Sequence, residues 1–93
     1  MTKSDLIEAV AETSPAMTKK TIEDAVNAIF GAMSDALSRG DRIEIRGLGT
    51  FCVKERHARV GRNPKTGAPV EIPTRRVPHF TAGKALRARV AEE

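Results

Sequence analysis

The sequence contains no tryptophan and no tyrosine, and it has only three phenylalanines and one cysteine. A single cysteine excludes an internal disulfide, which favours a reducing cytoplasm. Single-strand-binding modules rely on aromatic stacking, for which this chain has few rings. No run of 18 apolar residues is present, so we expect no membrane span. Residues 1–5 lack the apolar segment of a secretory signal, and we expect none.

Acidic residues are scarce in the second half of the chain. The net charge of +4 combines −3 over residues 1–41 with +9 over residues 42–89 and −2 at the end. Such an asymmetry is typical of proteins that bind nucleic acid or another anionic surface. Within residues 56–76, Glu71 is the single acid among six basic residues, which are Arg56, Arg59, Arg62, Lys65, Arg75 and Arg76. We therefore expect a polyanionic partner.

Candidate catalytic and metal-binding residues are also few. The side chains to consider are Cys52, His57 and His79. Their spacing matches no zinc pattern, and no third group is available to orient a Cys–His nucleophile. We predict that the protein is not an enzyme and that it has no metal and no cofactor.

The first 40 residues predict a helical hairpin. Thr2 is placed as an N-cap, with Asp5 in the position of a capping-box acid. Ser14-Pro15 ends the first helix, Thr18 begins the second, and Gly40 closes it. The apolar stripe of the second helix consists of Ile22, Val26, Ile29, Met33 and Leu37.

The periodicity then changes from 3.6 to 2. Residues 42–46 alternate isoleucine with charged residues, as a half-buried strand does. A second strand is predicted over Thr50–Arg56, running on into the basic segment. We expect the return strand to end near Val77-Pro78 and a short helix to cover about Ala82–Val90, with Thr81 as its cap. The order α-α-β-β-β-α indicates an α+β fold.

Residues 56–76 predict a two-stranded β-ribbon. In Asn63-Pro64-Lys65-Thr66-Gly67 the proline presets φ for a turn, and the glycine takes a positive φ. Pro69 and Pro73 each remove a backbone donor, which a central strand rarely tolerates. A free ribbon of this kind is marginally stable, so we expect its partner to order it.

Without the ribbon, about 70 residues remain, and a core of that size rarely supplies more than ~3–5 kcal/mol. Since neither disulfides nor a metal are expected, we predict a dimer with a shared core. The predicted dimer core consists of Ile29, Phe30, Met33, Leu37, Ile43, Ile45, Phe51 and Phe80.

Four segments together carry a resemblance to a known family: IEIRGLGTF at 43–51, GRNPKTG at 61–67, VPHF at 77–80, and Gly83-Lys84. They resemble the bacterial HU and integration host factor family of histone-like DNA-binding proteins. The VPHF segment and the Thr2-Lys3-Ser4 start are most similar to the integration host factor β subunit. Thr81-Ala82 departs from the lysine and proline of that pattern, which weakens the β-subunit assignment.

The resemblance implies an intertwined dimer with a helical base and a three-stranded β-sheet that extends into a two-stranded arm. It implies one domain, with 1–40 as helical base, 41–55 and 77–81 as sheet body, 56–76 as β-arm and 82–93 as C-terminal helix. The arms of this family wrap double-stranded DNA in the minor groove and bend it, with a proline wedge between base pairs. The wedge would be Pro64.

The same resemblance implies the DNA-binding residues: Arg46, Lys54, Arg56, Arg59, Arg62, Asn63, Pro64, Lys65, Arg75, Arg76, Lys84 and Arg87. Arg46 suits a strand-edge role equally well. Several alternatives stay open. The chain is a mostly non-sequence-specific homodimer, a sequence-preferring subunit that needs a different partner chain, an RNA-binding module, or a dimer that holds an acidic protein. For the DNA-binding alternatives we expect a cytoplasmic, nucleoid-associated location in bacteria.

Overall fold

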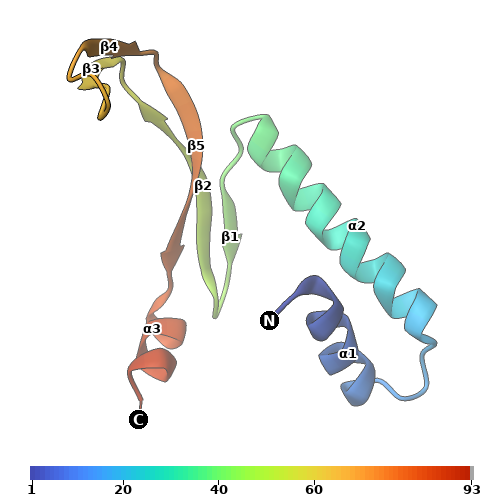
Figure 1. The fold of residues 1–93 in the computed structure, drawn as a ribbon. Coiled ribbons are helices and arrows are strands. Elements are labelled where there is room, and N and C mark those ends of the chain that lie inside the picture. The colour runs from blue at the N-terminus through green and yellow to red at the C-terminus, as the bar shows by residue number, and fades with distance from the viewer. Residues whose placement is uncertain (93) are drawn as a thin grey trace. The chain divides into compact units, whose positions relative to one another are not determined.

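The computed structural model describes residues 1–92, which form two compact units divided between residues 35 and 36 (Figure 1). No helix in this part of the chain is long and apolar enough to cross a membrane. The α+β fold predicted from the sequence is confirmed. Its elements are α1 (Lys3–Thr13), α2 (Lys19–Ser38), β1 (Ile43–Ile45), β2 (Gly49–Arg56), β3 (Arg59–Arg62), β4 (Pro69–Ile72), β5 (Arg75–Ala82) and α3 (Lys84–Ala91).

The helices of the first unit begin at residues whose side chains accept hydrogen bonds from backbone N–H groups that have no partner within the helix. Thr2 Oγ1 accepts a hydrogen bond from the Asp5 N–H (3.2 Å), and Asp5 Oδ2 accepts one from the Thr2 N–H (2.9 Å). This reciprocal pair is the predicted capping box. Thr18 Oγ1 accepts from the Thr21 N–H (3.1 Å) at the start of α2, as expected.

The core of the first unit is small. Among the described residues the buried apolar side chains are Ile7, Ile22 and Val26, with Val10 and Ala11 packed against them. The next apolar residues along α2 lie at the surface of the single chain, since Ile29 is 57% exposed and Phe30 is 40% exposed. The apolar stripe of α2 is therefore longer than the core that it covers in one chain.

The end of α2 belongs to the second unit and closes with a Schellman motif. Gly40 adopts a φ of 83°, which a residue with a Cβ rarely tolerates. Its N–H donates to the Leu37 carbonyl (2.9 Å), and the Asp41 N–H donates to the Ala36 carbonyl (2.9 Å). These bonds satisfy carbonyl groups that the helix end leaves without partners. The predicted closing role of Gly40 is confirmed.

Three antiparallel strands form the body of the second unit in the order β1-β2-β5. The β2–β5 ladder runs from Gly49 opposite Ala82 to Arg56 opposite Arg75. Across this ladder, Phe51 and Phe80 pair with ring centroids 4.6 Å apart. A Cβ on Gly49 would collide with the Thr81 carbonyl oxygen and would lie 2.8 Å from the Phe80 ring. The close approach of β2 to β5 therefore requires glycine at this position.

Two predictions about the last third of the chain are wrong. The return strand does not end near Val77-Pro78, because β5 continues to Ala82. Pro78 is tolerated there because β5 lies at the edge of the sheet. Thr81 does not cap a helix from Ala82, since it pairs with Thr50 within the ladder. Helix α3 begins at Lys84. Its N-cap residue is Gly83, which has no side chain to accept a capping hydrogen bond.

The predicted ribbon is confirmed as an antiparallel pair of β3 and β4, but it is a separate two-stranded sheet. The second strand continues into the arm as predicted, with a break in the ladder between Arg56 and Arg59. The ladder is interrupted at His57-Ala58 on one side and Pro73-Thr74 on the other. Pro73 has no N–H to donate. Across the interruption, the Ala58 N–H donates to Thr74 Oγ1 (3.2 Å).

Candidate nucleic-acid interface

The tip of the arm, residues 63–68, is ordered by its own hydrogen bonds. Asn63 holds it, because its N–H donates to the Ala68 carbonyl (2.9 Å) and its carbonyl accepts from the Gly67 N–H (2.7 Å). The Asn63 side chain also accepts from the Lys65 N–H (2.9 Å). Gly67 has a φ of 72°, as the predicted turn requires. Pro64 is exposed, so its ring is available to a partner.

Strand β3 places cations on both faces of the arm, whereas β4 carries none. The register sets Arg59 opposite Ile72 and Arg62 opposite Pro69, three residues further along β3. Side chains alternate along a strand, so these two arginines belong to opposite faces. Val60 is 70% exposed on the face of Arg62. A cationic ribbon with an exposed apolar residue between its charges suits a groove whose walls are phosphates.

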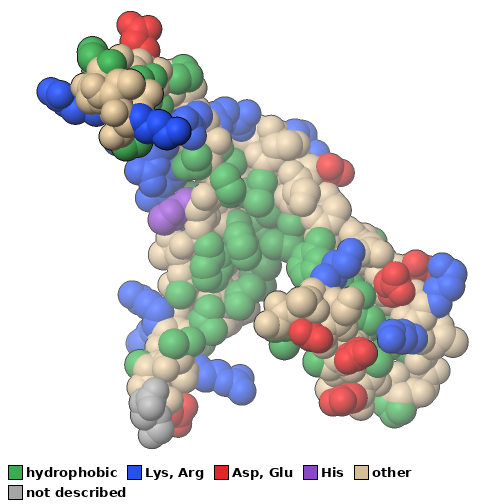
Figure 2. Space-filling model, viewed as in Figure 1, with side chains coloured by type: hydrophobic (Ala, Val, Ile, Leu, Met, Phe, Trp, Pro, Cys, Tyr) green, Lys and Arg blue, Asp and Glu red, His purple; other side chains and the backbone are tan. Residues whose placement is uncertain are grey.

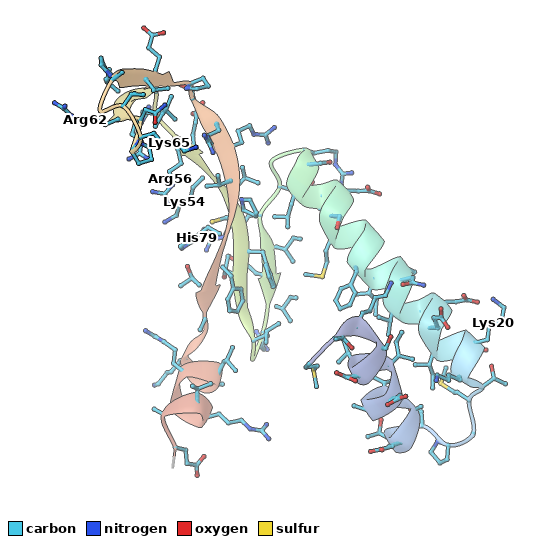
Figure 3. The ribbon with its side chains drawn as sticks, in the orientation of Figure 1. Lys20, Lys54, Arg56, Arg62, Lys65 and His79 are labelled. Carbon is cyan, nitrogen blue, oxygen red and sulfur yellow. The ribbon has the colours of Figure 1, made fainter. Side chains whose placement is uncertain are left out.

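The sheet body has one polar face and one apolar face. Residues 50, 52, 54 and 56 of β2 share a face with residues 75, 77, 79 and 81 of β5. This polar face carries Lys54, Arg56 and Arg75 together with His79. The side chains of Lys54, Arg56 and His79 project to the same side of the ribbon (Figure 3). The opposite face carries the apolar residues Ile43, Ile45, Phe51, Val53, Pro78 and Phe80.

Arg76 differs from the other predicted DNA-binding residues of the strands. The register sets it opposite Glu55, on the apolar face of the sheet. Its Nη2 atom lies 3.0 Å from the point where a Cβ on Gly40 would be. The neighbouring Arg75 lies opposite Arg56, on the polar face. Two adjacent arginines that look equivalent in the sequence therefore have different surroundings.

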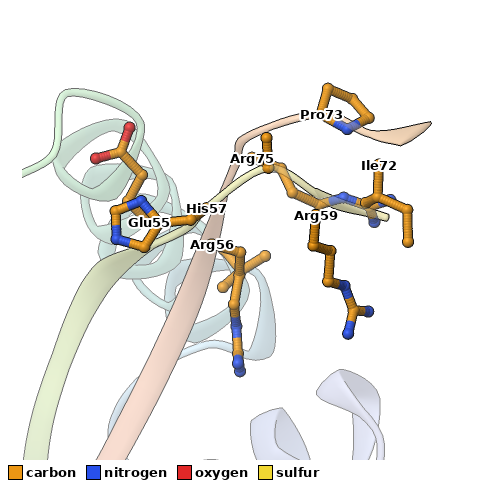
Figure 4. A pocket seen from close by; sticks show the side chains of 9 residues that line it. Glu55, Arg56, His57, Arg59, Ile72, Pro73 and Arg75 are labelled. Carbon is orange, nitrogen blue, oxygen red and sulfur yellow. The ribbon is translucent and has the colours of Figure 1, made fainter. Parts of the chain in front are cut away.

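A hollow of about 640 Å³ lies at the root of the arm. Its lining includes Arg56 of β2, Arg59 of β3 and Arg75 of β5, together with His57. The Arg56 and Arg59 side chains extend to one side, and Glu55 projects away from them (Figure 4). The fold therefore brings three guanidinium groups from three strands to one concave surface, which favours an anionic ligand.

A second hollow joins the turn after β1 to the start of α3. It is lined by residues that include Arg46 and Lys84, which are 38 positions apart in the sequence. The Gly83 N–H donates to the Leu48 carbonyl (2.9 Å) and fastens the two segments. Arg87 is exposed in the first turn of α3, where its N–H donates to the Gly83 carbonyl (3.0 Å). Arg46 and Lys84, which were predicted separately as DNA-binding residues, therefore line the same hollow.

Cys52 and His79 face each other across β2 and β5. This pairing was not predicted from the sequence, because it depends on the register of strands that are far apart in the chain. The structure contains no group of three or more potential metal-ligating side chains among the residues it describes. The pair places His79 beside the polar-face cations. The alternation of side chains along Val77-Pro78-His79-Phe80 in an edge strand was the sequence feature that could have indicated the face of His79.

Lys and Arg side chains surround the arm in the space-filling view, whereas hydrophobic side chains gather over the sheet (Figure 2). Residues 1–91 match the family described as bacterial DNA-binding proteins. The chain belongs to this family. The integration host factor subunit beta of Halorhodospira halophila is 56% identical over 90 residues, which cover 97% of this chain and 88% of that protein.

The corresponding subunit of an Azoarcus species is 57% identical over 90 residues, which cover 97% of this chain and 96% of that protein. An Anabaena HU–DNA cocrystal structure superposes with a TM-score of 0.89 at 44% identity, covering 100% of both chains. Membership of the HU and integration host factor family confirms the predicted architectural DNA-binding function. It also confirms the prediction that the protein is not an enzyme. The roles of individual residues, and the division into base, body, arm and C-terminal helix, stay predictions.

Proposed function

We propose that the chain acts as a dimer whose two arms enter the minor groove of double-stranded DNA and bend it by inserting Pro64. The observation that carries this proposal is the exposed Pro64 on a hydrogen-bonded loop that follows β3, the strand with Arg59 and Arg62. Architectural proteins that bind the minor groove, HU and integration host factor among them, insert apolar wedges between base steps. A proline wedge has no N–H, so its insertion leaves no backbone donor without a partner.

The tip supports a wedge because it is ordered before DNA arrives. The Asn63 hydrogen bonds fix the backbone on both sides of Pro64. Smooth bending of a 20–30 bp site by 40–90° costs about 1–6 kcal/mol. A localised kink at one base step concentrates this deformation, and phosphate contacts on either side offset its cost. Arg62, Asn63 and Lys65 flank the wedge in the groove.

The phosphate contacts that we assign follow the polar face and the arm. Lys54, Arg56 and Arg75 share the polar face, and Arg59 lines the hollow at the arm root. Arg46 and Lys84, which line one hollow, hold the DNA that flanks the kink, together with Arg87. Of the residues predicted to contact DNA, we leave out Arg76, which lies on the apolar face of the sheet. The assigned set is Arg46, Lys54, Arg56, Arg59, Arg62, Asn63, Pro64, Lys65, Arg75, Lys84 and Arg87.

The dimer is supported by apolar side chains that one chain leaves uncovered. Ile29 is 57% exposed, Phe30 is 40% exposed and Phe80 is 39% exposed, beside a core of three buried residues in the part of the chain that the structure describes. Burial of such surface contributes about 25 cal/mol per Å². We assign the shared core to the eight residues predicted from the sequence: Ile29, Phe30, Met33, Leu37, Ile43, Ile45, Phe51 and Phe80.

We propose a homodimer located in the bacterial cytoplasm on the nucleoid. A heterodimer is the second candidate, because relatives at 56% and 57% identity are named as a beta subunit. Sedimentation of the purified chain alone distinguishes these cases. The homodimer predicts twice the chain mass at micromolar concentration, and Phe30→Asp should dissociate it. A folded monomer, or a chain that dimerises only with a related subunit, contradicts it.

DNA binding is tested by the salt dependence of affinity for linear, nicked and kinked duplexes. If a dimer neutralises about 6–10 phosphates, log K should fall against log salt with a slope of about −0.9 per phosphate. Kinked and nicked duplexes should bind more tightly than linear DNA, because their deformation costs less. A slope near zero contradicts the proposal. Equal affinity for all three duplexes contradicts bending, and tighter binding to RNA favours the RNA-binding alternative.

A further inference from the structure

Arg75 and Arg76 are adjacent in the sequence, yet the ladder directs them to opposite faces of the sheet. Arg75 lies opposite Arg56, with Lys54 further along the same polar face. Arg76 lies opposite Glu55, on the face that carries Phe51 and Phe80. Of the two faces of the sheet, the polar face is the one that carries several cations and no large apolar surface. A duplex on the polar face is therefore within reach of Arg75 and on the far side of the sheet from Arg76.

The Arg76 side chain reaches the end of α2. Its Nη2 atom lies 3.0 Å from the position that a Cβ on Gly40 would occupy. A small hollow is lined by Gly40, Val53, Glu55 and Arg76. The C-terminal end of a helix carries a partial negative charge, which favours a cation beside it. Glu55, directly across the ladder, adds a carboxylate to the same surroundings.

Gly40 leaves space for the Arg76 guanidinium group, and it also adopts the backbone conformation that ends α2. Its φ of 83° belongs to the left-handed region, and a side chain there would meet the guanidinium group. Arg76 is the second residue of β5, immediately after the interruption that separates the arm from the sheet body. A contact at this point holds the root of the arm to the end of α2.

We propose that Arg76 is a positioning residue that anchors the root of the arm to the C-terminal end of α2, and that the DNA contact of this arginine pair belongs to Arg75. The inference rests on the proposed function, because it concerns how the bending arm is held. It replaces the sequence-based expectation that both arginines contact DNA.

The test compares Arg75→Ala with Arg76→Ala as a matched pair in the full-length protein. Two quantities are measured on one end-labelled linear duplex: the slope of log K against log salt, and the end-to-end energy transfer at saturating protein. In Arg75→Ala, each chain no longer neutralises one phosphate, which is worth about 0.9 in slope, so the slope of the dimer should become shallower by about 1.8. The saturating transfer should stay unchanged. Arg76→Ala should leave the slope unchanged and lower the saturating transfer, because the arm is less firmly oriented.

Either of two results for Arg76→Ala overturns the proposal: a slope that becomes shallower as it does in Arg75→Ala, or a saturating transfer that stays at the level of the parent. If Arg76→Ala does not fold by circular dichroism, Arg76→Gln decides by the same two quantities, since it keeps a polar side chain without the charge. A parent protein with no salt dependence and no energy transfer would instead refute the proposed function, which separates the two failures.

Discussion

Replacing Thr74 with valine should loosen the arm without removing any DNA contact. Thr74 Oγ1 accepts the Ala58 N–H at 3.2 Å, at the interruption where Pro73 cannot donate to the ladder. Valine keeps the shape of threonine but lacks the hydroxyl. A hydrogen bond of this kind contributes about 0.5–1.5 kcal/mol, so its removal should raise the open population of the arm root about 2- to 13-fold.

Two assays on the free protein measure this change. Amide hydrogen exchange at Ala58 should accelerate by at least this factor, because the Ala58 N–H loses its acceptor. Backbone order parameters of Val60 and Gly67 should fall, because they report the motion of the arm on the ps–ns timescale. Thr74→Ser is the matched control, since it keeps the hydroxyl and should behave as the parent. Unchanged exchange and order parameters in Thr74→Val would refute a role for this bond in holding the arm.

Three further predictions concern stability, each measured by denaturant unfolding. Thr2→Ala should cost about 1 kcal/mol because the cap of α1 is lost, whereas Thr2→Ser should cost little, and equal effects of the two would argue against the cap. Gly49→Ala should cost about 1–3 kcal/mol because its Cβ collides with the Thr81 carbonyl oxygen, and a neutral result would contradict that contact. Gly31→Ala should stabilise by about 0.5–1 kcal/mol, because no atom lies within 4 Å of the added Cβ in this exposed part of α2, and a loss of stability would show that a partner covers it.

The features that the sequence predicted correctly depend on neighbours within a few positions. The capping box needs only Thr2 and Asp5, and the close of α2 needs only Gly40 after an apolar stripe. The arm tip likewise follows from Pro64 and Gly67, whose φ preferences are intrinsic to the residue. Local steric and hydrogen-bonding rules were sufficient for these elements.

The incorrect or missing features depend on pairing between distant strands. Thr81 looks like a helix cap by itself, but Thr50 holds it in the ladder. Arg75 and Arg76 are indistinguishable by composition, and only the register assigns them to opposite faces, since a shift of one residue exchanges the faces. The interruption before β3 could be anticipated from Pro73, whereas the compensating hydroxyl of Thr74 could not.

Energy transfer between dyes at the two ends of a short duplex measures whether Pro64 kinks DNA. The duplex is titrated to saturation with the chain alone, with Pro64→Ala, and with Pro69→Ala as a control at the arm proline that directly follows the tip. Transfer should rise with the parent and with Pro69→Ala, and it should rise clearly less with Pro64→Ala at equal occupancy. Equal transfer from the parent and Pro64→Ala, or no rise from a folded and DNA-bound dimer, would contradict a kink at Pro64.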